Sequence, residues 1–282
     1  MIIDGWKYYN HAAIPAGAPH AEVDISPVEN KKIWELDGHP LLARWTSGFD
    51  CGYETEWWYV IIDKPFDISG IKSKRRYEIK KGNKHFLVKE IDPSDYIEEI
   101  YTITKAAYES YPEPYRPSLS HKSFTEDIKK WDFYKTYGAF SFADKELYGY
   151  ACLSRDDNYI NFRTIKVDPN QEKNAINAAL VYHLLADHEG FLKSGGYICD
   201  GERAVFHKTS FQDYLEKYFC FRKAYCTLHI AYRPAFGIII KAAFPFRKIL
   251  RKSGSNLLLV KSNALLNMEE IRRTFVKKDK TT

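Results

Sequence analysis

The fold is decided by residues 137–203, which read YGAFSFADKELYGYACLSRDDNYINFRTIKVDPNQEKNAINAALVYHLLADHEGFLKSGGYICDGER. Two short polar turns, at Asp144-Lys145 and at Asp156-Asp157-Asn158, separate runs in which aromatic or β-branched residues alternate with small or polar ones. This pattern predicts three consecutive antiparallel strands. After Pro169 the apolar residues adopt helical spacing up to an expected helix end at Gly190; they are Ile176, Ala179, Leu180, Leu184 and Leu185. A strand over GGYICDGER completes a β-β-β-α-β unit.

The junction of the third strand with the helix offers free backbone N–H groups, which can hold a phosphate. The order of elements resembles the core of the GNAT acyltransferase superfamily, and Val167-Asp168-Pro169 is similar to the V-x-P that opens that family's cofactor motif. The resemblance implies an α/β (α+β) fold with a mixed, mostly antiparallel central sheet flanked by helices. It also implies transfer of an acyl group from acetyl-CoA or another acyl-CoA to an amine, with no metal.

The same resemblance implies which residues bind the donor. The splayed end of the third strand would supply backbone N–H groups, and the next loop would hold the pyrophosphate; the residues are Ile165, Lys166, Val167, Asn170, Gln171, Lys173 and Asn174. The loop departs from the family pattern, because Glu172, Lys173, Ala175 and Asn177 stand where Gln or Arg and glycines are usual. Side chains crowd the backbone there and a carboxylate faces the phosphate position, so we expect weak coenzyme A binding or another donor.

Candidate proton-transfer groups follow on the return strand and the last helix of the core. Asp200 and Glu202 are the candidate bases, with His207 next to them, although Asp200-Gly201 is equally typical of a turn. The family pattern N-x-x-A-x-x-x-Y-x-x-x-G-F falls on Thr209, Gln212, Glu216, Cys220 and Phe221, of which only Phe221 matches. Glu216 therefore replaces the Tyr that often acts as the acid, and Tyr214 beside it is the candidate acid, with packing as the alternative.

A basic segment precedes this core. Seven cations lie within a few helical turns: Lys72, Lys74, Arg75, Arg76, Lys80, Lys81 and Lys84. A basic helix, Gly82 and the strand HFLVKEID follow one another as in Fem-type peptidyltransferases, and Arg75, Ile79 and Lys80 match their K-x-R-x-x-I-x-K-x-x-K type of segment. A solvated helix face and a surface for tRNA or another anionic ligand are both open interpretations.

Aromatic residues supply the candidate acceptor site. HPLLARWTSGFD and ETEWWYVIID predict a strand pair around Asp50-Cys51-Gly52, in which Trp57 and Trp58 form either a core layer, the favoured interpretation, or a wall for a sugar or acyl chain. A helix capped at Asp92 ends in the loop YPEPYRP, where Tyr115 and Arg116 would contact a small-molecule acceptor. A capping box at Ser123-Phe124-Thr125-Glu126 predicts the next short helix.

Composition limits the class of protein. The chain has 282 residues, 45% of them hydrophobic and 28% charged, with a net charge of +5, which suits a globular protein. No apolar run reaches the roughly 18–20 residues of a membrane span, and the start lacks a signal-like segment, so we expect a cytoplasmic protein, at most held at the inner face of the membrane. The five cysteines have no C-x-x-C pair and are expected to be buried free thiols.

The expected domains are 1–84, an N-terminal region; 85–233, the acyltransferase domain; and 234–282, a helical extension with a charged tail. In the extension AFGIIIKAAFPFRKILRK is either a docking helix or a membrane-surface helix with Arg247, Lys248, Arg251 and Lys252 on phosphate. The basic and aromatic flanks suggest an amino sugar of cell-surface polysaccharide biosynthesis as acceptor. A Fem-type aminoacyl-tRNA-dependent transferase and a non-catalytic binding protein are the alternatives.

Overall fold

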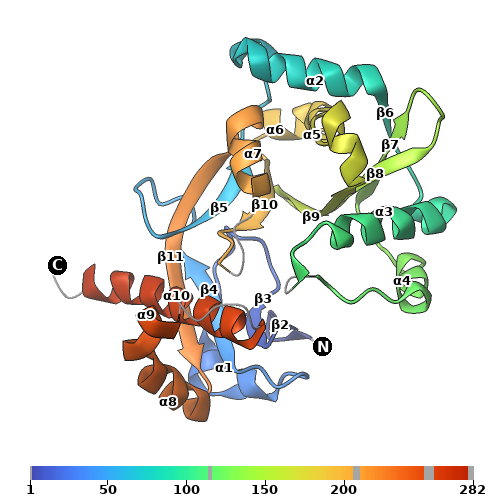
Figure 1. The fold of residues 1–282 in the computed structure, drawn as a ribbon. Coiled ribbons are helices and arrows are strands. Elements are labelled where there is room, and N and C mark those ends of the chain that lie inside the picture. The colour runs from blue at the N-terminus through green and yellow to red at the C-terminus, as the bar shows by residue number, and fades with distance from the viewer. Residues whose placement is uncertain (1, 114–115, 206–209, 251–256, 279–282) are drawn as a thin grey trace. The chain divides into compact units, whose positions relative to one another are not determined.

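The computed structural model describes residues 2–113, 116–205, 210–250 and 257–278 (Figure 1). The chain divides into two compact units: the first unit is Met1–Tyr59, Glu202–Thr209 and Lys223–Thr282, and the second unit is Val60–Gly201 and Ser210–Arg222. The consecutive domain limits expected from the sequence stay a prediction. Within the part of the chain that the structure describes, no helix is both long and apolar enough to span a membrane.

The second unit contains the predicted β-β-β-α-β core. Its elements are α2 (Ser73–His85), β6 (Phe86–Glu90), η3 (Pro93–Tyr96), α3 (Ile97–Glu109), α4 (His121–Ile128), β7 (Lys135–Ser141), β8 (Leu147–Asp156), β9 (Tyr159–Val167), η5 (Pro169–Asn174), α5 (Ile176–Asp187), α6 (Glu189–Lys193), β10 (Tyr197–Glu202) and α7 (Ser210–Phe219). Strands β6, β7, β8 and β9 pair antiparallel with their neighbours, and β9 pairs parallel with β10. The three predicted strands, the helix and the return strand are confirmed.

Helices cover both faces of this sheet. Adjacent residues of β8 point to opposite faces, and they meet different helices. Tyr150 faces α3, because its hydroxyl lies 2.7 Å from the Thr104 hydroxyl of that helix. Its neighbour Gly149 faces α5, because a Cβ added there would lie 3.0 Å from the Ile176 side chain and 3.2 Å from that of Leu180. The helix before the meander and the helix after it therefore lie on opposite faces.

The basic helix α2 packs directly against the start of α5 (Figure 1). Gly82 makes this close approach possible, because a Cβ there would lie 2.5 Å from the Ala175 carbonyl oxygen and 2.9 Å from the Ala179 nitrogen. Helix α2 continues past Gly82 to His85, so the glycine is a packing position inside the helix.

This contact gives a stability prediction. Replacing a glycine inside a helix with alanine ordinarily gains up to about 1 kcal/mol. At Gly82 the added methyl group collides with backbone atoms, so we expect Gly82→Ala to lower the free energy of unfolding by about 1–3 kcal/mol. Gly190 of α6 is the matched control, because a Cβ there meets nothing within 4 Å. Urea unfolding should show a lower midpoint for Gly82→Ala and an unchanged or higher one for Gly190→Ala; equal midpoints would contradict the close approach.

The first unit contains the remaining elements of the chain. Its elements are β1 (Ile2–Ile3), β2 (Trp6–Tyr9), β3 (Ala12–Pro15), α1 (Ser26–Glu29), η1 (Lys32–Glu35), β4 (Leu42–Ser47), the first half of β5 (Trp57–Ile62), β11 (Arg222–Tyr232), α8 (Pro234–Ala243), η6 (Phe244–Phe246), α9 (Arg247–Leu250) and α10 (Leu257–Lys278). The predicted pairing of β4 with β5 is wrong. β11 lies between them and pairs antiparallel with β4 from Thr227↔Ser47 to Tyr232↔Leu42.

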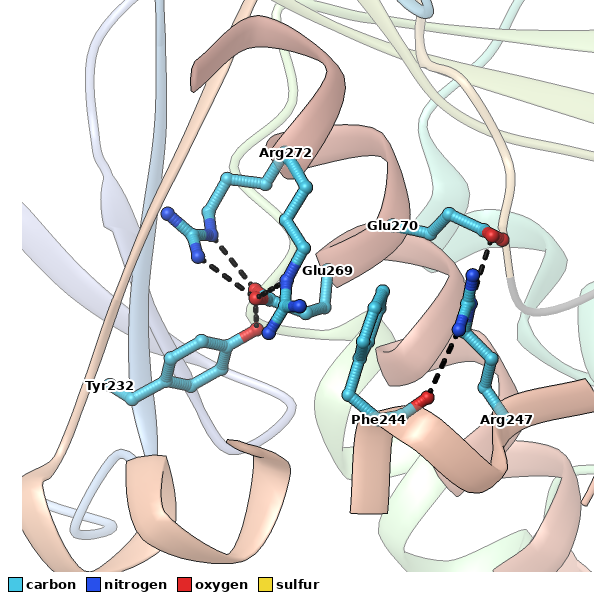
Figure 2. A network of polar contacts seen from close by, with 7 residues as sticks. Tyr232, Phe244, Arg247, Glu269, Glu270 and Arg272 are labelled. Carbon is cyan, nitrogen blue, oxygen red and sulfur yellow. Dashed lines mark hydrogen bonds and ion pairs between the residues drawn. The ribbon is translucent and has the colours of Figure 1, made fainter. Parts of the chain in front are cut away.

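Helix α10 covers β11 and β4 through an apolar cluster that includes Met268 and Ile271. The same helix carries a buried carboxylate, Glu269, which is 2% exposed. It accepts hydrogen bonds from the Tyr232 hydroxyl at 2.9 Å, from Arg272 at 2.8 Å and from Arg273 at 2.7 Å (Figure 2). Burial opposes its ionisation, but the two guanidinium groups prevail and hold the pKa of Glu269 below its usual value.

Removing this charge should destabilise the first unit. We expect Glu269→Gln to lower the free energy of unfolding by about 3 kcal/mol at pH 7, because it leaves two arginines without their shared partner. The loss should shrink as the pH falls from about 4.5, the usual pKa of the group in the unfolded chain, toward the lower pKa of the folded state, because the unfolded wild type then binds a proton that the folded carboxylate does not. Glu270→Gln is the control. Glu270 forms an ion pair with Arg247 at 2.9 Å that is more exposed than the contacts of Glu269, so this substitution should cost less than about 1 kcal/mol. Equal losses for both variants would contradict this account.

Three smaller expectations need correction. Helix α5 ends at Asp187, and Gly190 lies inside the following short helix α6 rather than ending α5. Helix α4 begins at His121 after Ser120, so the capping box expected at Ser123 does not form. Of the five cysteines, all of them free thiols, Cys152, Cys199 and Cys226 are buried as expected, whereas Cys220 is exposed and Cys51 half-buried.

Candidate functional site

The candidate site begins where β9 and β10 stop pairing. Their parallel register joins Tyr159, Ile160 and Asn161 to Tyr197, Ile198 and Cys199. Further along β9, the Asp168 nitrogen donates to the Tyr148 oxygen of the preceding strand at 2.8 Å. Because backbone groups alternate in direction along a strand, the N–H groups of Ile165 and Val167 point away from β8, toward the side on which β10 pairs. Two backbone donors thus lie beyond the segment that pairs with β10, and their use for an oxyanion stays a prediction.

Asp200 immediately follows the last paired residue of β10, and it is half-buried. Burial raises the pKa of its carboxyl to about 7, while a hydrogen bond from the Gln212 side chain of α7 opposes the rise. A carboxyl group with a pKa near neutrality can both accept and return a proton at physiological pH. The residue lies within strand β10, which continues through Gly201 at φ +98 to Glu202, so Asp200-Gly201 is part of a strand and not a turn.

Lys166, the middle residue of the β9 segment predicted to bind the acyl donor, brings a second charged group. The Lys166 ammonium group donates a hydrogen bond of 2.8 Å to the Tyr111 hydroxyl and lies 5.2 Å from the ring centroid of Tyr108. Tyr108 is a half-buried residue near the end of α3 and Tyr111 follows that helix, so the start of the loop predicted to bind the acceptor reaches β9. Arg116 in that loop is exposed and its Nε atom donates to the Tyr111 carbonyl at 2.8 Å, which places it beside the same tyrosine.

In the loop that would hold a pyrophosphate, the polar groups form hydrogen bonds with one another. Residues 169–174 form η5, and the Asp168 carboxylate accepts the Asn170 N–H at 2.9 Å, in the position that an anion would take. The Asn174 amide donates to the Gln171 side chain at 2.8 Å, and Lys173 and Glu172 are exposed. Ala175 then takes a left-handed conformation with φ 62 before α5 begins. Two carboxylates and an internally bonded turn therefore replace the glycine-rich phosphate loop.

Helix α2 adds a basic surface beside this loop. Lys72, Lys74, Lys80 and Lys84 are exposed, and Arg75 and Lys81 are half-buried. Arg76 has a structural role, since one of its terminal nitrogens donates to the carbonyls of Ser69 at 2.8 Å and Ile71 at 2.7 Å. Helix α2 and the candidate base Asp200 both interact with α7. Glu78 of α2 acts electrostatically on Tyr214 of α7, and Gln212 of α7 forms a hydrogen bond with Asp200.

Other predicted residues lie elsewhere. Tyr214 faces an aromatic group on α7, 4.8 Å from the ring of Tyr218 and 6.0 Å from that of Phe211, and burial raises the pKa of its hydroxyl above its usual range. Glu202 belongs to the first unit and forms an ion pair with Arg44 there. His207 and Tyr115 lie outside the described residues. None of these contacts joins Asp200, so the catalytic roles expected for Glu202, His207 and Tyr214 stay predictions.

The two tryptophans also belong to the first unit. Trp57 is fully buried in its core and offers no face to a ligand, in line with the packing interpretation, so we do not retain it in the site. Trp58 is half-buried between two cations, with Arg203 4.5 Å and Lys223 4.6 Å from its ring centroid. Among the described residues no group of three His, Cys, Asp or Glu side chains could hold a metal ion.

Sequence comparison adds nothing, since no family model and no curated protein matches the chain. Among solved structures, L-PGS from Bacillus licheniformis is similar with a TM-score of 0.54 at 11% identity, over 87% of this chain and 85% of that one. A DUF2156 domain from Agrobacterium fabrum gives 0.48 at 8% identity, over 86% and 84%. The Escherichia coli ribosomal-protein-S18-alanine N-acetyltransferase gives 0.28 at 19% identity, over 36% and 58%.

At such identities a likeness shows the fold alone. The order of elements, the parallel start of β9 and β10 and the helices on both faces agree with the fold expected from residues 137–203. The chain therefore has a GNAT-like fold, with mostly antiparallel sheet strands flanked by helices.

Proposed function

We propose that this protein transfers an aminoacyl group from aminoacyl-tRNA to the amino or hydroxyl group of an acceptor. The observation that carries the proposal is the loop from Asp168 to Ala175. Its polar groups bond one another, a carboxylate takes the anion position, and α2 packs against the start of the following helix. An acyl-CoA donor needs that loop for its pyrophosphate, whereas an aminoacyl-tRNA does not, because its acyl ester is attached to a terminal ribose.

The basic helix α2 supplies what such a donor needs instead. Three lysines of α2 and Lys72 just before it are exposed. Among the described residues neither these four side chains nor those of Arg75 and Lys81 have an ion-pair partner. Cations without an ion-pair partner along one helix attract a nucleic-acid backbone, and the salt dependence of binding increases with the number of phosphates that they neutralise. The fold that this chain shares with L-PGS supports the proposal of an acyl-transfer reaction.

The chemistry follows from the site residues. The Asp200 carboxylate takes the proton of the acceptor nucleophile, which attacks the carbonyl carbon of the aminoacyl ester. The N–H groups of Ile165 and Val167 point to the side where the oxyanion of the tetrahedral intermediate would form. When the intermediate collapses, the carbon–oxygen bond to the ribose breaks, and the ribose oxygen receives the proton from Asp200. The intermediate needs no phosphate contact in the η5 loop.

A transfer assay tests this proposal. The protein is incubated with tRNA charged with radiolabelled amino acids and with a panel of amines and hydroxyl compounds that includes amino sugars, the acceptor class expected from the sequence. We expect label to move from tRNA to an acceptor, and no transfer from labelled acetyl-CoA under the same conditions. Transfer from acetyl-CoA with none from charged tRNA would overturn the proposed donor and restore the acyl-CoA enzyme expected from the sequence.

A further inference from the structure

Helices α8 and α9 of the first unit present an apolar face to solvent. Ile238, Ile239, Phe246 and Ile249 are 72%, 59%, 59% and 69% exposed. Ile238 and Ile239 lie on α8, Phe246 on η6 and Ile249 on α9, so exposed apolar side chains recur along the whole segment α8-η6-α9. Soluble proteins seldom leave several large apolar side chains together in water without a partner for them.

The opposite side of the same segment is firmly packed, which fixes the orientation of the exposed face. Ile240 and Phe244 are buried, 5% and 8% exposed. The Phe244 ring lies between two guanidinium groups, 4.2 Å from that of Arg247 and 3.6 Å from that of Arg273 of α10 (Figure 2). The docking role expected from the sequence thus accounts for the inner side only, and the outer side is left for something else.

Charge indicates the partner. Residues 234–250 contain no acidic residue, and Lys241 and Lys248 are exposed on the segment that carries the four apolar side chains. Arg247 is engaged internally by Glu270. An apolar face flanked by lysines and free of acids fits the boundary between acyl chains and anionic headgroups. We propose that α8-η6-α9 is a peripheral docking surface for membranes rich in anionic lipid. The proposal rests on this segment and not on the transferase reaction.

Vesicle flotation with the full chain tests it. The probes are vesicles of 30% phosphatidylglycerol in phosphatidylcholine and vesicles of phosphatidylcholine alone. We expect binding to the anionic vesicles that weakens with added salt, and binding at least tenfold weaker to the neutral ones. Lys241→Gln with Lys248→Gln should weaken anionic binding about 10–30-fold, since each lysine near the surface contributes about fivefold. Equal binding to both kinds of vesicle would overturn the assignment to anionic lipid.

The apolar contribution has its own variant and control. Ile238→Glu with Ile249→Glu should weaken anionic binding by at least about 30-fold, because two inserted side chains become charged. Ile2→Glu with Leu87→Glu is the control: these side chains are 64% and 48% exposed on other elements, and the pair adds the same charge. No wild-type binding at 1 mM lipid, or equal loss in both double variants, would overturn the proposal. So would sedimentation showing that wild type self-associates through this face without lipid.

Discussion

Asp200→Asn should lower kcat/KM for acyl transfer by about 10²–10⁴-fold, the usual contribution of a positioned general base. The amide cannot accept the acceptor's proton, but it keeps the shape of the side chain and can still bond Gln212. Asp213→Asn is the control, because Asp213 is the exposed acid next to Gln212 on the same helix. Equal activity of the two variants would remove Asp200 from the mechanism.

The pH dependence separates a base from a residue that merely packs. Since burial raises the pKa of Asp200 to about 7, wild-type kcat/KM should increase with pH and level off above about 7. Gln212 lowers that pKa through its hydrogen bond, so in Gln212→Ala the curve should move to higher pH. A purely structural Gln212 would lower the rate without moving the curve.

Stability should change in the opposite sense to activity. The folded state of the wild type binds the Asp200 proton more tightly than the unfolded state, whose pKa is near 3.8, so ionising it costs stability as the pH rises from about 4 to about 7. Asp200→Asn removes this cost. The variant and the wild type should therefore have equal unfolding free energies near pH 4. At pH 8 the variant should be more stable by about 2–4 kcal/mol, a value reduced to allow for the partial exposure of Asp200. Urea unfolding at both pH values measures it, and a gain that does not depend on pH would contradict the buried carboxyl.

The second large effect is expected on donor binding. Replacing Lys74, Lys80 and Lys84 of α2 with Gln should weaken tRNA binding about 10²-fold at 50 mM salt, because each lost phosphate contact contributes several-fold. Arg76 is left unchanged because it holds the start of the helix. Filter binding measures the affinities.

The control for this variant removes the same charge from another surface of the second unit. Lys105, Lys122 and Lys129 are exposed on α3 and at α4, on the face of the sheet opposite α5. Their replacement by Gln should change tRNA affinity less than about threefold. Equal weakening by the two triple variants would mean that net charge, and not the surface of α2, attracts the RNA.

Local patterns in the sequence were enough for the core. Turn residues at 144–145 and 156–158, the stop at Pro169 and the helical spacing from Ile176 gave the right elements in the right order, because each signal acts over a few residues. The place of β11 between β4 and β5 depends on contacts between residues more than 150 positions apart, such as the Thr55 hydroxyl with the Cys226 carbonyl at 2.8 Å. No local pattern contains that information.

The site was predictable in part for the same reason. Position near the end of a strand suggested Asp200, Ile165 and Val167, and their roles stay predictions. The bond from Gln212 to Asp200 could not be foreseen, because it joins two elements through the fold. The contact of Gly82 with α5 could not be foreseen for the same reason, and an isolated glycine within a lysine-rich helix was its only local signal. The 3₁₀ turn at η5 follows from Asp168 and Pro169, a cap and a first-position proline.

The most direct test of the donor is a pair of binding titrations at 50 and 200 mM salt, one with aminoacyl-tRNA and one with acetyl-CoA. If α2 contacts the RNA backbone and the η5 loop holds no pyrophosphate, tRNA should bind with micromolar or better affinity that falls steeply with salt, and acetyl-CoA should bind weakly at both concentrations. Tight binding of acetyl-CoA, together with tRNA binding that is absent or insensitive to salt, would contradict the account.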